Sequence, residues 1–214
     1  MAWDCIAIAA RLTWRRLGLL LTANVLWLVL SLPIVTWPAA TGGLFYLINC
    51  VVKEELDIEP RYARLSDFWD GFRRYGLRSS LLSILDLLMM AVIIAALRFY
   101  SQSSVEWLRW LIGPIGLVAL AWAGAQLYLY PLLIQRPERQ PWELAREAFL
   151  IAISYAAPTL SLLVTTIILA AGAAALAGPV LLIFFSLLGM IETVALRLVM
   201  IQQGEIIPIR RSEK

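Results

Sequence analysis

Six long apolar stretches, separated by polar segments, make up most of this chain. A hydrocarbon core of about 30 Å needs roughly 20 helical residues, and only the second stretch is clearly shorter than that. Because the stretches lack the alternation of barrel strands, their backbone groups must be satisfied within helices. The pattern predicts an all-α polytopic membrane helix bundle with six transmembrane helices, at approximately residues 17–37, 39–52, 79–100, 108–135, 158–176 and 178–202.

The composition and the positions of Lys and Arg extend this picture. Hydrophobic residues make up 61% of the chain, and no polar interval is long enough for a soluble domain, so we expect one integral membrane domain over residues 1–214. The connections predicted to face outwards hold only Arg98 and Arg109, whereas the other connections and both ends are rich in Lys and Arg. The positive-inside rule then places both termini in the cytoplasm, in a multi-pass protein of the cell inner membrane. The net charge of +3 fits contact with an anionic lipid leaflet better than nucleic-acid binding.

Two cytoplasmic segments, at approximately residues 66–76 and 141–151, have the pattern of interfacial helices. The first places its aromatic residues on one helical face and its charged residues mostly on the other: Phe68, Trp69, Phe72 and Tyr75 against Asp67, Asp70, Arg73 and Arg74. Each segment leads directly into a predicted span, so a unit of span, interfacial helix and span occurs twice. Either the two units form a parallel internal repeat, or each linker became amphipathic independently; both interpretations stay open.

A distinctive set of residues occupies the first two stretches and the first interfacial segment. It comprises Asn24, Trp27, Ser31, Pro33, Thr36, Pro38, Asp67, Phe68, Trp69, Gly71 and Phe72. Over about residues 20–80 the chain resembles the YesL-like family of bacterial multi-spanning membrane proteins of unknown function, although Trp37 stands where relatives usually have glycine. The resemblance implies a non-enzymatic accessory or scaffold component associated with carbohydrate uptake, with carbohydrate ABC-transporter components as partners.

The prolines of this set predict a sharp turn between the first two stretches. Pro33 cannot donate to a helix ladder, and Pro38 restricts the residue before it. Thr36 or Thr41 can satisfy the backbone groups that are freed there. We prefer a structural hairpin to a ligand site as the interpretation of this segment.

Three ionisable residues fall inside predicted spans, where each costs about 3 kcal/mol at mid-bilayer. Asp86 and Arg197 lie at similar depths from the cytoplasmic side, so we expect them to hold the third and sixth spans together as an ion pair. Glu192 lies deeper and has no obvious partner, which makes it a proton-coupling candidate if it is buried and unpaired.

Other polar residues fall in the inner halves of their spans. Together with the ionisable residues they predict a cytoplasm-facing polar cluster of Asn24, Asn49, Asp86, Gln126, Glu192 and Arg197. This cluster is either a hydrogen-bonded bundle core or the lining of a vestibule for a polar solute; both alternatives stay open.

Catalytic chemistry finds little support. The chain has no histidine, which excludes histidine metal sites and a Ser–His relay, and Cys5 and Cys50 are too far apart in the sequence for a metal-binding motif. We therefore predict no catalytic residue, metal or cofactor. The preferred function is the accessory role, the alternative is a small solute transporter or channel, and an intramembrane enzyme is a distant third. Homo-oligomerisation is open.

Overall fold

The computed structural model describes residues 2–56, 61–103, 105–176 and 181–204. Across these residues the chain forms nine helices and no strand, which confirms the predicted all-α class. The helices are α1 (Ala2–Arg15), α2 (Leu17–Ser31), α3 (Trp37–Glu55), α4 (Leu65–Ser101), α5 (Glu106–Arg109), α6 (Ile112–Gln135), α7 (Pro141–Ser154), α8 (Ala156–Leu176) and α9 (Leu181–Gln202).

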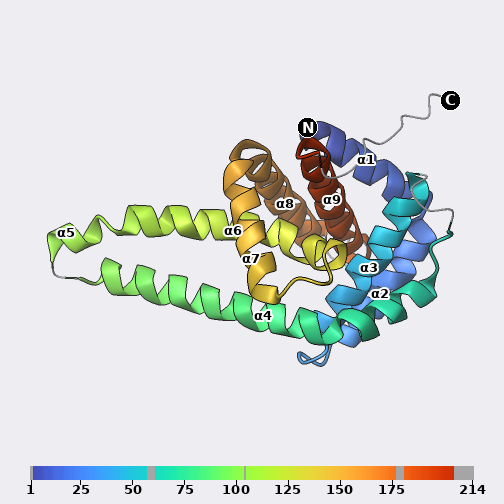
Figure 1. The fold of residues 1–214 in the computed structure, drawn as a ribbon, viewed down its shortest axis with the longest axis horizontal. Helices are drawn as coiled ribbons and strands as arrows, with labels where there is room; N and C mark the ends of the chain where they lie inside the picture. The colour runs from blue at the N-terminus through green and yellow to red at the C-terminus, as the bar shows by residue number, and fades with distance from the viewer. Residues whose placement is uncertain (1, 57–60, 104, 177–180, 205–214) are drawn as a thin grey trace.

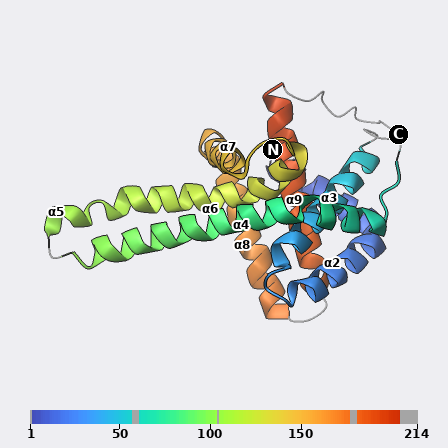
Figure 2. The same ribbon diagram turned by 60° about the horizontal axis from the view of Figure 1, so that its bottom comes forward.

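The helices form a bundle from which one hairpin extends. Figure 1 shows α1, α2, α3, α7, α8 and α9 packed together, while α4 and α6 leave the bundle side by side with α5 at the tip. In both views the hairpin runs across α8 and α9 rather than along them (Figure 2). Beyond Leu82, Ile93 is the sole buried residue of α4. The outer half of the hairpin therefore exposes a largely apolar surface.

Within the described residues, four helical segments are long and apolar enough to cross a membrane. They are Leu65–Ser101, Trp107–Gln135, Ala156–Ala174 and Ile183–Gln202. The apolar helix α2 has 15 residues and is shorter than a span requires. The chain is thus a membrane protein by length and composition of its helices, but six crossings are not confirmed. The start of the predicted sixth span, residues 178–180, and the basic C-terminal residues lie outside the described part.

The first predicted interfacial helix is not a separate element. It continues into the predicted third span as α4, whose 37 residues would extend for about 55 Å at 1.5 Å per residue. No proline interrupts this stretch, and isolated glycines such as Gly71 and Gly76 are tolerated inside a helix. The second segment does form its own helix, because α7 ends at Ser154 and the helical backbone is interrupted at Tyr155 before α8 begins. The two predicted repeat units therefore differ in shape.

The aromatic face of the first segment packs against protein rather than lying in lipid. Phe68 and Tyr75 are buried, and the rings of Tyr46 and Tyr75 lie 5.6 Å apart between α3 and α4. Trp69 is the aromatic residue of this segment that is exposed. The sequence pattern identified the apolar face correctly, but α3, not the bilayer, covers most of it.

Two glycines allow α3 and the first half of α4 to approach closely. A Cβ atom placed on Gly71 would lie 2.5 Å from Cβ of Tyr46 and 3.0 Å from Cα of Gly43. A Cβ atom on Gly43 would lie 2.8 Å from the carbonyl oxygen of Phe68. Side chains at these positions would force the two backbones apart, so both glycines define the spacing of this helix pair.

Asp67 is fully buried, whereas the sequence pattern placed it on the charged, outward face of the segment. Its carboxylate accepts a hydrogen bond from the backbone N–H of Arg64 at 2.8 Å and another from the guanidinium of Arg61. The negative charge of Asp67 raises the pKa of Arg61 above its usual value. The residue caps the start of α4, since a carboxylate in the first turn satisfies a backbone donor that the helix leaves free.

The predicted turn between the first two stretches is present. α2 ends at Ser31 and α3 begins at Trp37, with Pro38 in its first turn. The hydroxyl of Thr36 donates to the carbonyl oxygens of Leu30 and of Pro33, the latter at 2.8 Å. As expected, a threonine satisfies backbone groups that the proline turn frees.

Candidate functional site

The six residues of the predicted polar cluster do not form one group. In the first place, the side chains of Asn49, Gln135 and Arg197 join α3, α6 and α9. Arg197 donates from Nη2 to Oδ1 of Asn49 at 3.2 Å, and Gln135 donates from Nε2 to the same oxygen at 3.3 Å. Arg197 and Asn49 are both buried. This group has the geometry of interhelical bonding inside a bundle core, as the first alternative expects.

Asp86 belongs to a second place, between α4 and α6. Its Oδ1 atom accepts hydrogen bonds from Nε1 of Trp122 at 3.0 Å and from Nε2 of Gln126. The predicted ion pair of Asp86 with Arg197 does not occur, because the two side chains contact different residues on different helices. Similar depth along two helices did not ensure that the side chains face one another.

Asn24 occupies the third place, fully buried on α2 and outside both groups. Nearby on the same helix, Trp27 donates from Nε1 to the hydroxyl of Thr41 at 3.1 Å, which ties α2 to α3. Trp27 therefore helps to build the α2–α3 pair.

Asp86 and Glu192 both line a cavity of about 530 Å³ between the bundle and the base of the hairpin. The walls come from α2, the α2–α3 turn, α3, α4, α6 and α9. Most of the lining is apolar, and seven lining side chains are polar: Thr41, Ser80, Ser83, Asp86, Gln126, Tyr130 and Glu192. A volume of this size is in the range of small-molecule sites.

Glu192 stands apart from the other polar residues of the cavity. It is 8% exposed, and among the described residues it has neither a hydrogen bond nor an ion pair. The neighbouring turn of α9 is held in place, because the thiol of Cys5 donates to the carbonyl oxygen of Ile191 at 3.3 Å. A fixed backbone thus presents an unpaired carboxyl group to the cavity, and leaving such a group buried is costly without a partner.

Aromatic rings form a substantial part of the cavity wall. The rings of Trp27 and Phe185 lie 4.3 Å apart, and those of Phe45 and Tyr130 stack at 5.3 Å with an interplanar angle of 15°. The hydroxyl of Tyr130 forms a hydrogen bond with that of Ser83 at 2.9 Å. These contacts fix the wall residues and leave the centre of the cavity open.

Sequence reasoning missed several lining residues, although a signal was present. Ser80, Ser83 and Asp86 recur every three residues on α4, so they share one helical face. Gln126 and Tyr130 are four residues apart on α6 and share a face in the same way. A search for polar side chains at helical spacing inside the apolar stretches would have found both lines. The contribution of Phe185 from α9 has no comparable signal.

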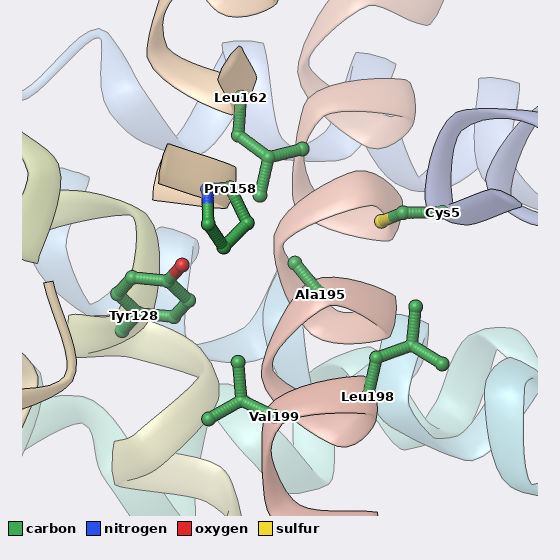
Figure 3. A pocket seen from close by; sticks show the side chains of 7 residues that line it. All are labelled: Cys5, Tyr128, Pro158, Leu162, Ala195, Leu198 and Val199. Carbon is green, nitrogen blue, oxygen red and sulfur yellow. The ribbon is translucent and has the colours of Figure 1, made fainter. Parts of the chain in front are cut away.

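A second cavity, lined by Cys5, Tyr128 and Leu162 among others, has a different character. Figure 3 shows these side chains around a narrow gap between α1, α6, α8 and α9. Its volume of about 10 Å³ leaves room for no more than about one water molecule. The hydroxyl of Tyr128 is already bonded to that of Thr159 at 2.9 Å. We regard this gap as a packing defect.

Comparison with known proteins supports the resemblance seen in the sequence. Residues 20–97 match the family model described as "Protein of unknown function, DUF624". This is the family usually called YesL-like. The predicted YesL-like resemblance is confirmed. The YesL-like segment contains most of α2, all of α3 and most of α4, and thus the proline turn, the α3–α4 contact and the α4 wall of the cavity.

The YesL-like motif residues are mainly structural. The proline turn holds Ser31, Pro33, Thr36 and Pro38, whereas Phe68 and Gly71 contact α3. Trp27 and Pro38 also reach the cavity. Searches of the curated proteins and of the solved structures find no match.

Proposed function

We propose that this chain is an integral membrane protein that binds a small solute in the cavity between its bundle and its hairpin. The observation that carries the proposal is Glu192, a buried carboxyl group that has no partner among the described residues and faces about 530 Å³ of open space. A site that orients a solute needs such convergent polar groups within a mostly apolar lining. The proposal is a binding or transport role and not a catalytic one.

We further propose that the protein lies in the cytoplasmic membrane with both ends of the chain in the cytoplasm. The distribution of Lys and Arg supports this orientation. Four crossings, by α4, α6, α8 and α9, give the same placement of the ends as the predicted six, because both numbers are even.

The packing of α3 favours four crossings over six. Gly42 and Gly43, near the middle of the predicted second span, lie against the part of α4 around Phe72 and Tyr75. The adjacent residues Arg73 and Arg74 of α4 are exposed. If α3 crossed the hydrocarbon core, these two arginines would face lipid at the same depth, at a cost of about 3 kcal/mol each.

In this topology α2 and α3 form a hairpin that enters the membrane from the cytoplasmic side. The base of this α2–α3 hairpin is charged, with Arg16 bound to Glu55 at 3.1 Å and to Glu54. Its tip is apolar and exposed: Leu32, Ile34 and Val35 are each at least 80% exposed. A charged base and an apolar tip suit a hairpin that reaches into the inner leaflet. The cavity beside the tip would then lie in the inner half of the membrane.

A cavity-filling substitution tests solute binding. The protein is purified into nanodiscs directly from its native membrane, and bound small molecules are detected by native mass spectrometry. Ser83→Trp places a large ring in the cavity, whereas Leu88→Trp places the same ring on an exposed position of α4 as a control. We expect a bound solute on the wild type and on Leu88→Trp but not on Ser83→Trp. Equal occupancy of all three proteins, or none on the wild type, would contradict the proposal.

An accessory role in carbohydrate uptake is the second candidate. The YesL-like match supports it only through what that family resemblance implies. The specific structural support is the exposure of Trp69 on α4 and of Trp142 on α7, at 40% and 61%, which leaves both cytoplasmic helices with aromatic surface for a partner. Recovery of carbohydrate ABC-transporter components with the wild type, but not with Trp69→Ala/Trp142→Ala, would support this role.

A further inference from the structure

The cavity carries a charge imbalance that identifies the kind of solute it suits. Its lining includes two carboxyl groups, those of Asp86 and Glu192, and no Lys or Arg among the described residues. Both carboxyl groups line the same cavity as the hydroxyl of Tyr130. An anionic solute would therefore find no cationic side chain in this lining to pair with.

The two carboxyl groups differ in their freedom to bind a solute. Asp86 already accepts hydrogen bonds from Trp122 and Gln126, which hold its carboxylate in one orientation. Glu192 has no such partner among the described residues. Asp86 therefore supplies a fixed negative charge, and Glu192 is the group with free hydrogen-bonding capacity.

The remaining lining argues against a bare metal ion. Small hard cations take about six or more oxygen ligands at short distance, and most of this wall is apolar. In contrast, a cation with apolar substituents would make apolar contacts with the walls and would be attracted by the carboxyl groups. The rings of Trp27, Phe45, Tyr130 and Phe185 line the cavity, and aromatic faces attract cations.

We infer that the solute of this cavity is a small organic cation with apolar substituents, of the substituted-ammonium type, bound by Glu192 and Asp86. The inference rests on the proposed solute-binding function and names the chemical class of the solute. A cationic head group gives Glu192 the partner that the described part of the protein does not supply, and the aromatic wall accommodates the substituents.

Two probes of equal shape separate the effect of charge from that of apolar contact. Trimethylphenylammonium is the cation and tert-butylbenzene its neutral isostere. Binding of each to the purified protein in nanodiscs is measured by tryptophan fluorescence and by calorimetry, with empty nanodiscs as the baseline for partition into lipid. The variants are Glu192→Gln, Asp86→Asn and Ser83→Trp, with Glu138→Gln as control because Glu138 is exposed in the α6–α7 loop.

We expect the wild type and Glu138→Gln to bind the cation at least about tenfold more tightly than the isostere, a difference of about 1.4 kcal/mol. Glu192→Gln should remove most of this preference, Asp86→Asn should reduce it, and Ser83→Trp should abolish binding of both probes. Since Glu192 has no partner to lose within residues 2–56, 61–103, 105–176 and 181–204, its variant should keep the melting temperature of the wild type, which separates a binding defect from misfolding.

The contrary outcomes are distinguishable. If both probes bind equally, and Ser83→Trp but not Glu192→Gln abolishes binding, the cavity binds solutes and the inferred cation preference is wrong. If neither probe binds above the empty-nanodisc baseline, or if Ser83→Trp binds both as the wild type does, the inferred ligand class and the cavity as the site of these probes are both overturned.

Discussion

At the residue scale, the two acidic residues of the cavity have opposite relations to the fold. Asp86 accepts two hydrogen bonds from α6, whereas Glu192 accepts none from the described protein. Hydrogen bonds to a charged acceptor contribute about 1.5–3 kcal/mol each at most, and removing the acceptor leaves the buried donors unsatisfied. The two residues should therefore respond differently to substitution.

Removal of the Asp86 carboxylate should weaken the contact between α4 and α6. We expect Asp86→Ala to lower the free energy of unfolding by about 1–3 kcal/mol, because Trp122 and Gln126 both lose their acceptor. Unfolding in mixed micelles of increasing denaturing detergent measures the change. Asp70→Ala, on the exposed face of α4, serves as control and should change stability little. Equal effects of the two substitutions would contradict a bonding role for Asp86.

Glu192 should show the opposite behaviour. Replacing it by Gln or Leu removes no hydrogen bond that the structure describes, and Leu also removes the cost of burying a polar group, so stability should stay constant or rise. The same unfolding assay measures this. A loss of more than about 1 kcal/mol in both variants would show that Glu192 has a structural partner.

Residue types could be predicted from the sequence more reliably than their partners. The sequence identified Asp86, Glu192 and Arg197 as the ionisable residues within the apolar stretches, and it left Glu192 without a partner, in agreement with the structure. It paired Asp86 with Arg197 because their depths are similar. Depth follows from counting along a helix, but pairing depends on how each helix is rotated about its axis and on which helix lies beside it. The rotation of each helix and the identity of its neighbour cannot be read from a single sequence.

At the scale of elements, the contact between α3 and α4 is the closest helix pair of the YesL-like segment. Gly71→Ala would place a Cβ atom 2.5 Å from Cβ of Tyr46 and 3.0 Å from a backbone atom of α3. Alanine favours a helix over glycine by about 1 kcal/mol, whereas overpacking a tight contact costs about 1–3 kcal/mol. We expect a net loss of stability, measured as a lower melting temperature in detergent.

Gly116→Ala on α6 is the matched control. A Cβ atom there meets nothing within 4 Å, so the helix-forming advantage of alanine should act alone. We expect unchanged or higher stability. If both glycine substitutions stabilised the protein, the close approach of α3 and α4 would be wrong.

The helices themselves were largely predictable, but their continuity was not. The amphipathic pattern gave the start of α4 and the position of α7 to within a few residues. The sequence suggested a break between the interfacial segment and the third span because polarity changes near Arg78. A change in polarity alters what surrounds a helix and does not end it. A proline or an unsatisfied backbone group would be needed for that.

At the scale of the whole molecule, the apolar pattern alone does not determine the number of crossings. The stretch at residues 39–52 is as apolar as a short span, yet the structure buries Leu44, Leu47, Ile48 and Val51 almost completely inside the protein. Protein interior and lipid exclude water alike, so hydropathy does not distinguish them. In contrast, the outer half of α4 exposes Leu87, Leu88 and Val92, which in a membrane protein require lipid.

The steep crossing of the two pairs of candidate spans has a consequence for the bilayer. If α8 and α9 stand upright, the α4–α6 hairpin must tilt strongly or turn at its base to cross the same membrane (Figure 2). The cavity lies at this base. A change in the angle of the hairpin would therefore change the shape of the proposed solute site.

In the proposed topology the α4–α6 hairpin crosses the membrane and the α2–α3 hairpin does not. The most direct test is labelling of intact cells with a membrane-impermeant thiol reagent, using single-cysteine variants Ser101→Cys and Val35→Cys in a Cys5→Ser/Cys50→Ser background. Ser101 ends α4 at the outer tip, and Val35 lies at the tip of the α2–α3 hairpin. We predict labelling at position 101 from outside the cell and none at position 35. Labelling at position 35, or its absence at position 101, would contradict the account.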